Sequence, residues 1–212
     1  PSNTRAAPAI HGRWRQLFSR AWRTRTLVGC AFFTCQVIPY FAVGTFVSQV
    51  MSAMKLESGY AGGLVYNLSL LAGAVVGLMV VDRVSRRSML IGTFGTAASA
   101  MLLLCVWSSI PAAIMIVLFA LFAGVLSAAS NLVYVYLPEL FSTDLRASGI
   151  GLAVAACRIG SAVSTFLLPV VVASYGVRSA LGACVAVLVA GTVICLIWAP
   201  ETRHVRLETL DG

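Results

Sequence analysis

Six long apolar segments constrain the fold of this chain more than any other feature. They run over residues 27–52, 60–81, 88–107, 111–136, 147–174 and 179–198. A helix of roughly 20 apolar residues crosses a hydrocarbon core of ~30 Å and satisfies its own backbone hydrogen bonds. Charged residues make up only 10% of the chain, whereas soluble domains carry about 25%. The sequence therefore predicts an all-α membrane protein with six transmembrane helices, and it argues against a soluble enzyme.

The basic residues lie at alternate ends of these segments and predict the topology. Twelve fall on one side of the expected membrane, namely Arg5, Arg13, Arg15, Arg20, Arg23, Arg25, Arg83, Arg86, Arg87, Arg146, Arg203 and Arg206. Only Lys55 and Arg178 fall on the other side. Because cytoplasmic loops are enriched in Lys and Arg, both termini are expected in the cytoplasm. The predicted organisation is a cytoplasmic linker over 1–26, a six-helix unit over 27–198 and a cytoplasmic tail over 199–212. This orientation accounts for the net charge of +8 without nucleic acid as a partner.

The linker has a pattern of its own. Apolar residues recur there at helical spacing, with arginines off that stripe: Trp14, Leu17, Phe18, Ala21 and Trp22. This pattern predicts an amphipathic helix on the inner membrane surface. The alternative is a linker helix that packs on protein.

One charged residue falls inside an apolar segment. Arg158 lies about 11 residues into the fifth segment, close to the expected bilayer centre, where a guanidinium costs at least ~2.5–3.5 kcal/mol to insert. The acids of this chain all fall in loops or in the tail. Three explanations stay open: an anionic ligand or pathway, an acid on another polypeptide segment, or carbonyl groups at a helix break.

Other polar residues are unevenly distributed among the segments. They share helix faces in the first, fourth and fifth segments, as Gln36 and Tyr40; Ser127, Asn131 and Tyr134; and Arg158, Ser161 and Thr165. Tyr66 and Asn67 lie in the second segment. The third and sixth segments carry only small hydroxyl groups. We expect the first group to face a cavity and the other two to face lipid, although each residue taken alone could instead bond a neighbouring helix.

The sequence offers no set of residues suited to catalysis or metal binding. The six cysteines lie in apolar segments without a C-x-x-C pair, and His11 and His204 lie near opposite ends of the chain. Buried cysteines of this kind behave as small hydrophobic residues. We therefore expect no enzyme activity, no catalytic residue, no cofactor and no metal.

Three short motifs resemble those of the major facilitator superfamily. Residues 82–87 read DRVSRR, similar to the D-R-x-G-R-R loop of that family. Residues 136–151 read YLPELFSTDLRASGIG, similar to Y-x-x-E-x-(F/Y)-P-T-x-x-R-x-x-G-x-G. Residues 200–203 read PETR, similar to P-E-T-(K/R). The sequence departs from these patterns at Ser85, where glycine is usual, and at Ser142, where proline is usual.

The resemblance implies a six-helix half of a twelve-helix transporter. The chain would supply helices seven to twelve as two inverted three-helix repeats, in the bacterial inner membrane. An absent N-terminal half, the lipid bilayer, a small-molecule substrate and a proton would be its partners. The motif charges Asp82, Arg83, Arg86, Arg87, Glu139, Arg146 and Glu201 would form ion pairs that latch the cytoplasmic ends. Asp82 would accept hydrogen bonds from Arg86 or from a neighbouring helix N-terminus. Glu139 would pair with Arg83 or Arg87, and Arg146 with Glu201. The alternative is a set of solvated charges that only direct topology.

The sequence thus predicts secondary active transport of a small polar solute by alternating access. An organic acid anion is the favoured substrate, because the Arg158 guanidinium offers a bidentate fork to a carboxylate. Hydrogen bonds and an aromatic wall would come from Gln36, Tyr40, Asn67, Asn131 and Tyr134. A sugar porter is the alternative, since amides also suit sugar hydroxyls. A receptor or scaffold, a pore and a membrane enzyme fit less well.

Overall fold

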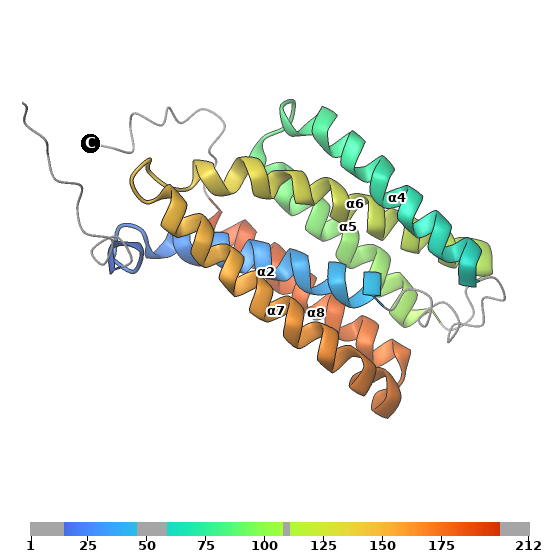
Figure 1. Ribbon diagram of the computed structural model, residues 1–212. Helices are drawn as coiled ribbons and strands as arrows, with labels where there is room; N and C mark the ends of the chain where they lie inside the picture. The colour runs from blue at the N-terminus through green and yellow to red at the C-terminus, as the bar shows by residue number, and fades with distance from the viewer. Residues whose placement is uncertain (1–14, 46–58, 108–110, 200–212) are drawn as a thin grey trace, which may run out of the picture.

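Six long helices make up the described part of the chain in this computed structural model (Figure 1). Residues 15–45, 59–107 and 111–199 are described, and within them lie α2 (Arg23–Thr45), α4 (Gly59–Val81), α5 (Arg86–Val106), α6 (Ala112–Glu139), α7 (Arg146–Tyr175) and α8 (Val177–Trp198). All six contain spans that are long and apolar enough to cross a membrane. The predicted all-α fold class is confirmed.

Local sequence explains several helix boundaries. The Ser85 side chain caps α5 by accepting a hydrogen bond from the backbone N–H of Ser88, and Pro111 precedes the first turn of α6. Gly176 separates α7 from α8 by a single residue and has a φ of 81°. This left-handed conformation favours glycine because other residues carry a Cβ that clashes there. The two last helices therefore reverse direction in a very short turn.

The helices pack in two groups of three that do not follow chain order. In one group α2 contacts α7 and α8, and in the other α6 contacts α4 and α5 (Figure 1). Helices α5 and α8 join the two groups. Exchanging α2 with α6, α4 with α7 and α5 with α8 leaves these main contacts unchanged. This is the pattern expected of two three-helix repeats that exchange partners.

Aromatic side chains fill the centre of the bundle. The Phe32 ring of α2 meets the rings of Phe94 and Tyr136 edge-on, at centroid distances of 5.9 Å and 6.1 Å. All three side chains are buried. They join α2, α5 and α6, so the core connects the two helix groups.

Small residues let α4 and α6 approach closely. A Cβ built on Gly73 would overlap the backbone carbonyl of Gly124, and one built on Gly77 would lie 2.7 Å from the Cα of Ala128. Ser127 Oγ also donates to the carbonyl of Leu70 at 2.6 Å. Glycine at such contacts allows the close backbone packing that stabilises helix pairs in membranes.

The arginine-rich segment before α2 packs partly on protein. Residues 18–22 form turns, and only 15–17 precede them as a short helical piece. Leu17 is fully buried, and its carbonyl accepts a hydrogen bond from Thr26 Oγ1. Trp22 stacks on Phe141 with centroids 6.5 Å apart. The described part of this segment is therefore not the continuous amphipathic helix expected from its spacing, because Leu17 and Trp22 find partners on the bundle.

Candidate functional site

A polar pocket of about 280 Å³ lies between α2, α6 and α7. Four of the six residues expected at a substrate site line it, namely Gln36, Tyr40, Tyr134 and Arg158. They come from three helices that are distant in the sequence, and the bundle brings them together. This polar pocket is the candidate site.

Arg158 lies near the middle of α7. It follows Arg146, the first residue of this 30-residue helix, by about 18 Å at a rise of 1.5 Å per residue. Its side chain is exposed in the six-helix bundle. Among the described residues, no acid pairs with its guanidinium and no carbonyl accepts a hydrogen bond from it. The helix also continues through Arg158 without a break. Carbonyl groups freed at a helix break therefore do not compensate this charge.

Gln36 is held in place by α6. Its Nε2 donates to Ser130 Oγ at 2.7 Å and to the Leu126 carbonyl at 3.3 Å, and the residue is only 2% exposed. Ser130 Oγ in turn donates to the same carbonyl. Both acceptors require the nitrogen of the amide to face α6. The Oε1 atom accepts no hydrogen bond from the described residues and is available to a donor in the polar pocket.

Aromatic rings form much of the remaining wall. Tyr134 is 81% exposed, and the Tyr40 ring meets Phe41 edge-on at 5.5 Å. The polar pocket thus combines one cation, one amide acceptor and two phenol groups with apolar ring faces. Such a set of a few polar groups on an apolar wall is typical of small-molecule sites.

The two asparagines expected at the site lie elsewhere. Asn131 Nδ2 donates to the Ala74 carbonyl at 2.9 Å and so joins α6 to α4. Asn67 Nδ2 donates to Gly63, one turn earlier on α4, at 2.8 Å. Neither residue lines the polar pocket, and helix packing accounts for Asn131.

Sequence reasoning missed the other lining residues, which are Phe33, Val37, Phe41, Ser130, Val133 and Cys157. Phe33, Val37 and Phe41 could have been found, because they recur with Gln36 and Tyr40 at the i, i+4 spacing of one helix face. Ser130 and Val133 could not, since their distance from Gln36 in sequence gives no sign that α6 lies beside α2.

Arg86 is the centre of the charged cluster at the arginine-rich end of the bundle. It is 8% exposed, and its Nη2 lies 3.5 Å from Glu139 Oε1 and 3.7 Å from Asp82 Oδ1. Its Nη1 donates to the carbonyl of Val81. Glu139 therefore pairs with Arg86, which was not among the partners expected for it. This contact links the start of α5 to the end of α6.

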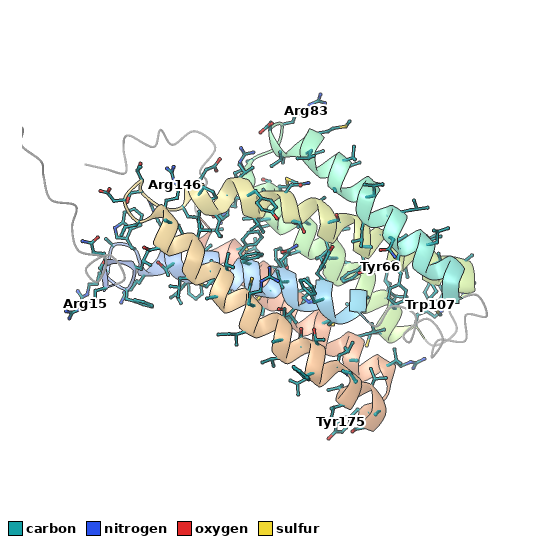
Figure 2. All side chains as sticks on the ribbon, in the orientation of Figure 1. Arg15, Tyr66, Arg83, Trp107, Arg146 and Tyr175 are labelled. Atoms are coloured by element: carbon teal, nitrogen blue, oxygen red, sulfur yellow. The ribbon has the colours of Figure 1, made fainter. Side chains whose placement is uncertain are left out.

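The other motif charges lie around this cluster. Arg87 donates to the carbonyl of Leu196 at 2.5 Å, and Arg83 is exposed. Nε and Nη2 of Arg146 are buried without an acceptor among the described residues. Glu201, its expected partner, lies outside the described residues. Figure 2 shows Arg15, Arg83 and Arg146 toward one end of the bundle, and Trp107 and Tyr175 toward the other.

Six membrane-length apolar helices with a polar pocket among them define a multi-pass membrane protein. The family described as "Sugar (and other) transporter" matches residues 2–212. The chain belongs to this family, which is part of the major facilitator superfamily.

Three similar proteins carry names that describe transport. The chain is 37% identical over 200 residues to the inner membrane metabolite transport protein YgcS of Escherichia coli, covering 94% of this chain and 44% of that protein. It is 33% identical to the putative metabolite transport protein YaaU of the same organism, over 92% of this chain and 45% of that protein. It is 28% identical to plastidic glucose transporter 4 of Arabidopsis thaliana, over 93% of this chain and 38% of that protein. The chain thus spans less than half the length of these relatives.

Proposed function

We propose that this chain is the C-terminal half of a secondary active transporter for a small organic acid anion, working by alternating access. The observation that carries the proposal is Arg158, which lies in the polar pocket near the middle of α7 without an anionic partner among the described residues. A guanidinium at the depth of the bilayer centre is stable only beside a compensating group. A carboxylate fits, because it accepts two parallel hydrogen bonds from the fork.

The rest of the polar pocket suits the body of such a solute. Gln36 Oε1 can accept a hydrogen bond from a hydroxyl group, and the phenol groups of Tyr40 and Tyr134 can donate or accept. The apolar ring faces can cover a short carbon skeleton. A sugar is the alternative substrate, supported by the same amide and rings and by the name of the plastid relative, but it leaves the charge of Arg158 uncompensated.

The second half of the transporter completes this mechanism. The relatives are more than twice as long as the matched region, so a second six-helix half would close the polar pocket from the opposite side. Large apolar side chains are exposed on α4 and α7, including Leu64, Leu71 and Phe166, and some of them would pack on that half. No acid lies inside the described spans except near their ends, so a coupling proton would bind in the second half. We place the transporter in a bacterial inner membrane with both termini of this chain in the cytoplasm.

Uptake of labelled solutes tests this function. The full-length protein containing this chain is reconstituted in liposomes and offered small carboxylates or neutral sugars, with and without an inward proton gradient. We expect carboxylates to accumulate, and to do so only with the gradient. Accumulation of sugars alone would establish the alternative, and carboxylate exchange unaffected by pH would remove the proton from the mechanism.

The Arg86–Glu139 contact is proposed to hold the start of α5 and the end of α6 in the arrangement that lets the cytoplasmic ends of the two halves close. Replacing Glu139 by Gln removes the anion nearest to Arg86. We expect the equilibrium to shift toward the inward-facing state by about fivefold, since partly exposed ion pairs contribute ~1 kcal/mol or less. Cysteine crosslinking between the cytoplasmic ends of the two halves measures this population.

Asp144→Asn is the matched control, because Asp144 is exposed and has no ion pair among the described residues. It should leave crosslinking unchanged. An unchanged population in Glu139→Gln as well would mean that the charges at this end act on topology only.

A further inference from the structure

A second cavity, entirely different in chemistry, lies on the other side of α2. This apolar cavity has a volume of about 360 Å³ and is lined by α2, α7 and α8. On α2 its walls are Ile38 and Ala42, which helical spacing places on the face opposite Gln36 and Tyr40. Its only side-chain hydroxyl is Ser164, which already donates to the Ser161 carbonyl at 2.9 Å.

The apolar lining of this cavity makes it unfavourable for a polar substrate and for water. A polar solute entering the apolar cavity would lose its hydrogen bonds to water and gain none in return. Apolar cavities stay dry for the same reason. An empty cavity would leave its lining without dispersion contacts on one side, so a hydrocarbon is the chemical class that fits.

The position of the apolar cavity points to one source of hydrocarbon. Its lining on α7 runs from Gly160 to Val171, in the half of that helix that ends at Tyr175. Its lining on α8 begins at Ala180, near the start of that helix. The apolar cavity therefore lies in one half of the membrane, and exposed Val163 and Leu167 extend its surface outward. Arg178 is exposed at the same end of the bundle.

We propose that the apolar cavity holds one acyl chain of a membrane phospholipid from the leaflet at the Arg178 end of the bundle. The acyl chain fills the space that α2, α7 and α8 enclose. It lies beside the contact at Gly160, where a Cβ would come within 2.7 Å of the Thr34 methyl group. The lipid thereby supports the helix pair that carries Arg158 and Gln36 and does not compete with solute for the polar pocket. This role does not depend on which solute is transported.

Lipid retention by the purified full-length protein tests the proposal. Val187 lines the apolar cavity, whereas Val189 is exposed on the same helix outside it. Val187→Phe fills the space, and Val189→Phe adds the same volume elsewhere. After extensive detergent washing, native mass spectrometry should find one phospholipid on the wild type and on Val189→Phe, and none on Val187→Phe. Equal retention by both variants would overturn the proposal.

A second measurement needs no substitution. Cys184 is buried and lines the apolar cavity, so an acyl chain should shield it from N-ethylmaleimide. Dioleoyl phosphatidylglycerol is added to delipidated wild-type protein at ten times its dissociation constant. The modification of Cys184 should then slow about tenfold, because binding reduces the population with an empty cavity by that factor. Cys105, which does not line the apolar cavity, should react at an unchanged rate.

Three outcomes contradict the proposal. An unchanged rate at Cys184 on adding phospholipid would exclude an acyl chain. Protection by oleate without protection by phospholipid would assign the apolar cavity to a free fatty acid. Dissociation of the two halves in Val187→Phe, with lipid retention unchanged, would assign it to protein contacts.

Discussion

Replacing Arg158 by Gln is expected to weaken solute binding by about 100-fold, because hydrogen bonds to charged groups contribute ~1.5–3 kcal/mol each and a factor of ten corresponds to 1.4 kcal/mol. Gln keeps a donor at similar reach but loses the charge and the planar fork. Arg158 makes no ion pair within the described residues, so its removal should leave the stability of this bundle nearly unchanged. Binding of labelled carboxylate to the purified full-length protein measures the loss, and thermal unfolding measures stability.

Arg158→Lys separates charge from geometry. Lysine retains the cation but not the bidentate fork, so binding should fall by about tenfold and the preference for carboxylates over neutral solutes should survive. Arg20→Gln is the matched control, since Arg20 is exposed outside the polar pocket. Full carboxylate binding by Arg158→Gln together with lower stability would instead identify Arg158 as the partner of an acid in the other half.

The fold was largely predictable because lipid allows few solutions. Backbone polar groups in a membrane must be satisfied within each helix, so apolar length alone located all six spans. Where the structure describes both sides of a helix boundary, the expected and observed positions differ by at most four residues. This largest difference is at the start of α2, which begins at Arg23 rather than Leu27. The first turn of α2 consists of arginine and threonine residues, which are compatible with a helix. Because these residues are not apolar, hydropathy placed the start of the helix too late. The pairing of helices was predictable only through the resemblance, since nothing in the apolar pattern says that α2 packs on α7.

The site was predictable only as far as helix faces. Spacing grouped Ser127, Asn131 and Tyr134 on one face of α6, and the structure divides that face. Ser127 and Asn131 bond α4, whereas Tyr134 lines the polar pocket. A face of a helix is wide enough to touch two neighbours, and sequence periodicity does not say which neighbour each residue meets. Arg158 was identifiable because charge within a span is costly at any position.

The close contact of α4 with α6 at Gly73 and Gly124, called the seam below, is where we expect a substitution to lower the free energy of unfolding most. At Gly73 any side chain would meet the backbone of Gly124 rather than a movable side chain. Gly73→Val should therefore force the two helices apart and weaken the bonds from Ser127 to Leu70 and from Asn131 to Ala74. Overpacking costs ~1–3 kcal/mol, and each interhelical hydrogen bond adds ~0.6 kcal/mol. We expect a loss of about 3 kcal/mol, measured by unfolding of the full-length protein in mixed micelles.

Gly63→Val shows that this loss comes from the seam and not from valine in a helix. Gly63 lies on the same helix α4, and nothing lies within 4 Å of a Cβ built there. Gly63→Val changes backbone freedom and χ1 restriction in the same way as Gly73→Val, but it creates no contact with α6. The free energy of unfolding of this variant should therefore stay within about 0.5 kcal/mol of wild type. The buried thiol of Cys195 provides an independent readout, because a thiol-reactive dye detects it on unfolding. Equal losses in both variants would mean that α4 and α6 can separate freely at Gly73. The C-terminal end of α4 would then have to be positioned by the Arg86 cluster instead.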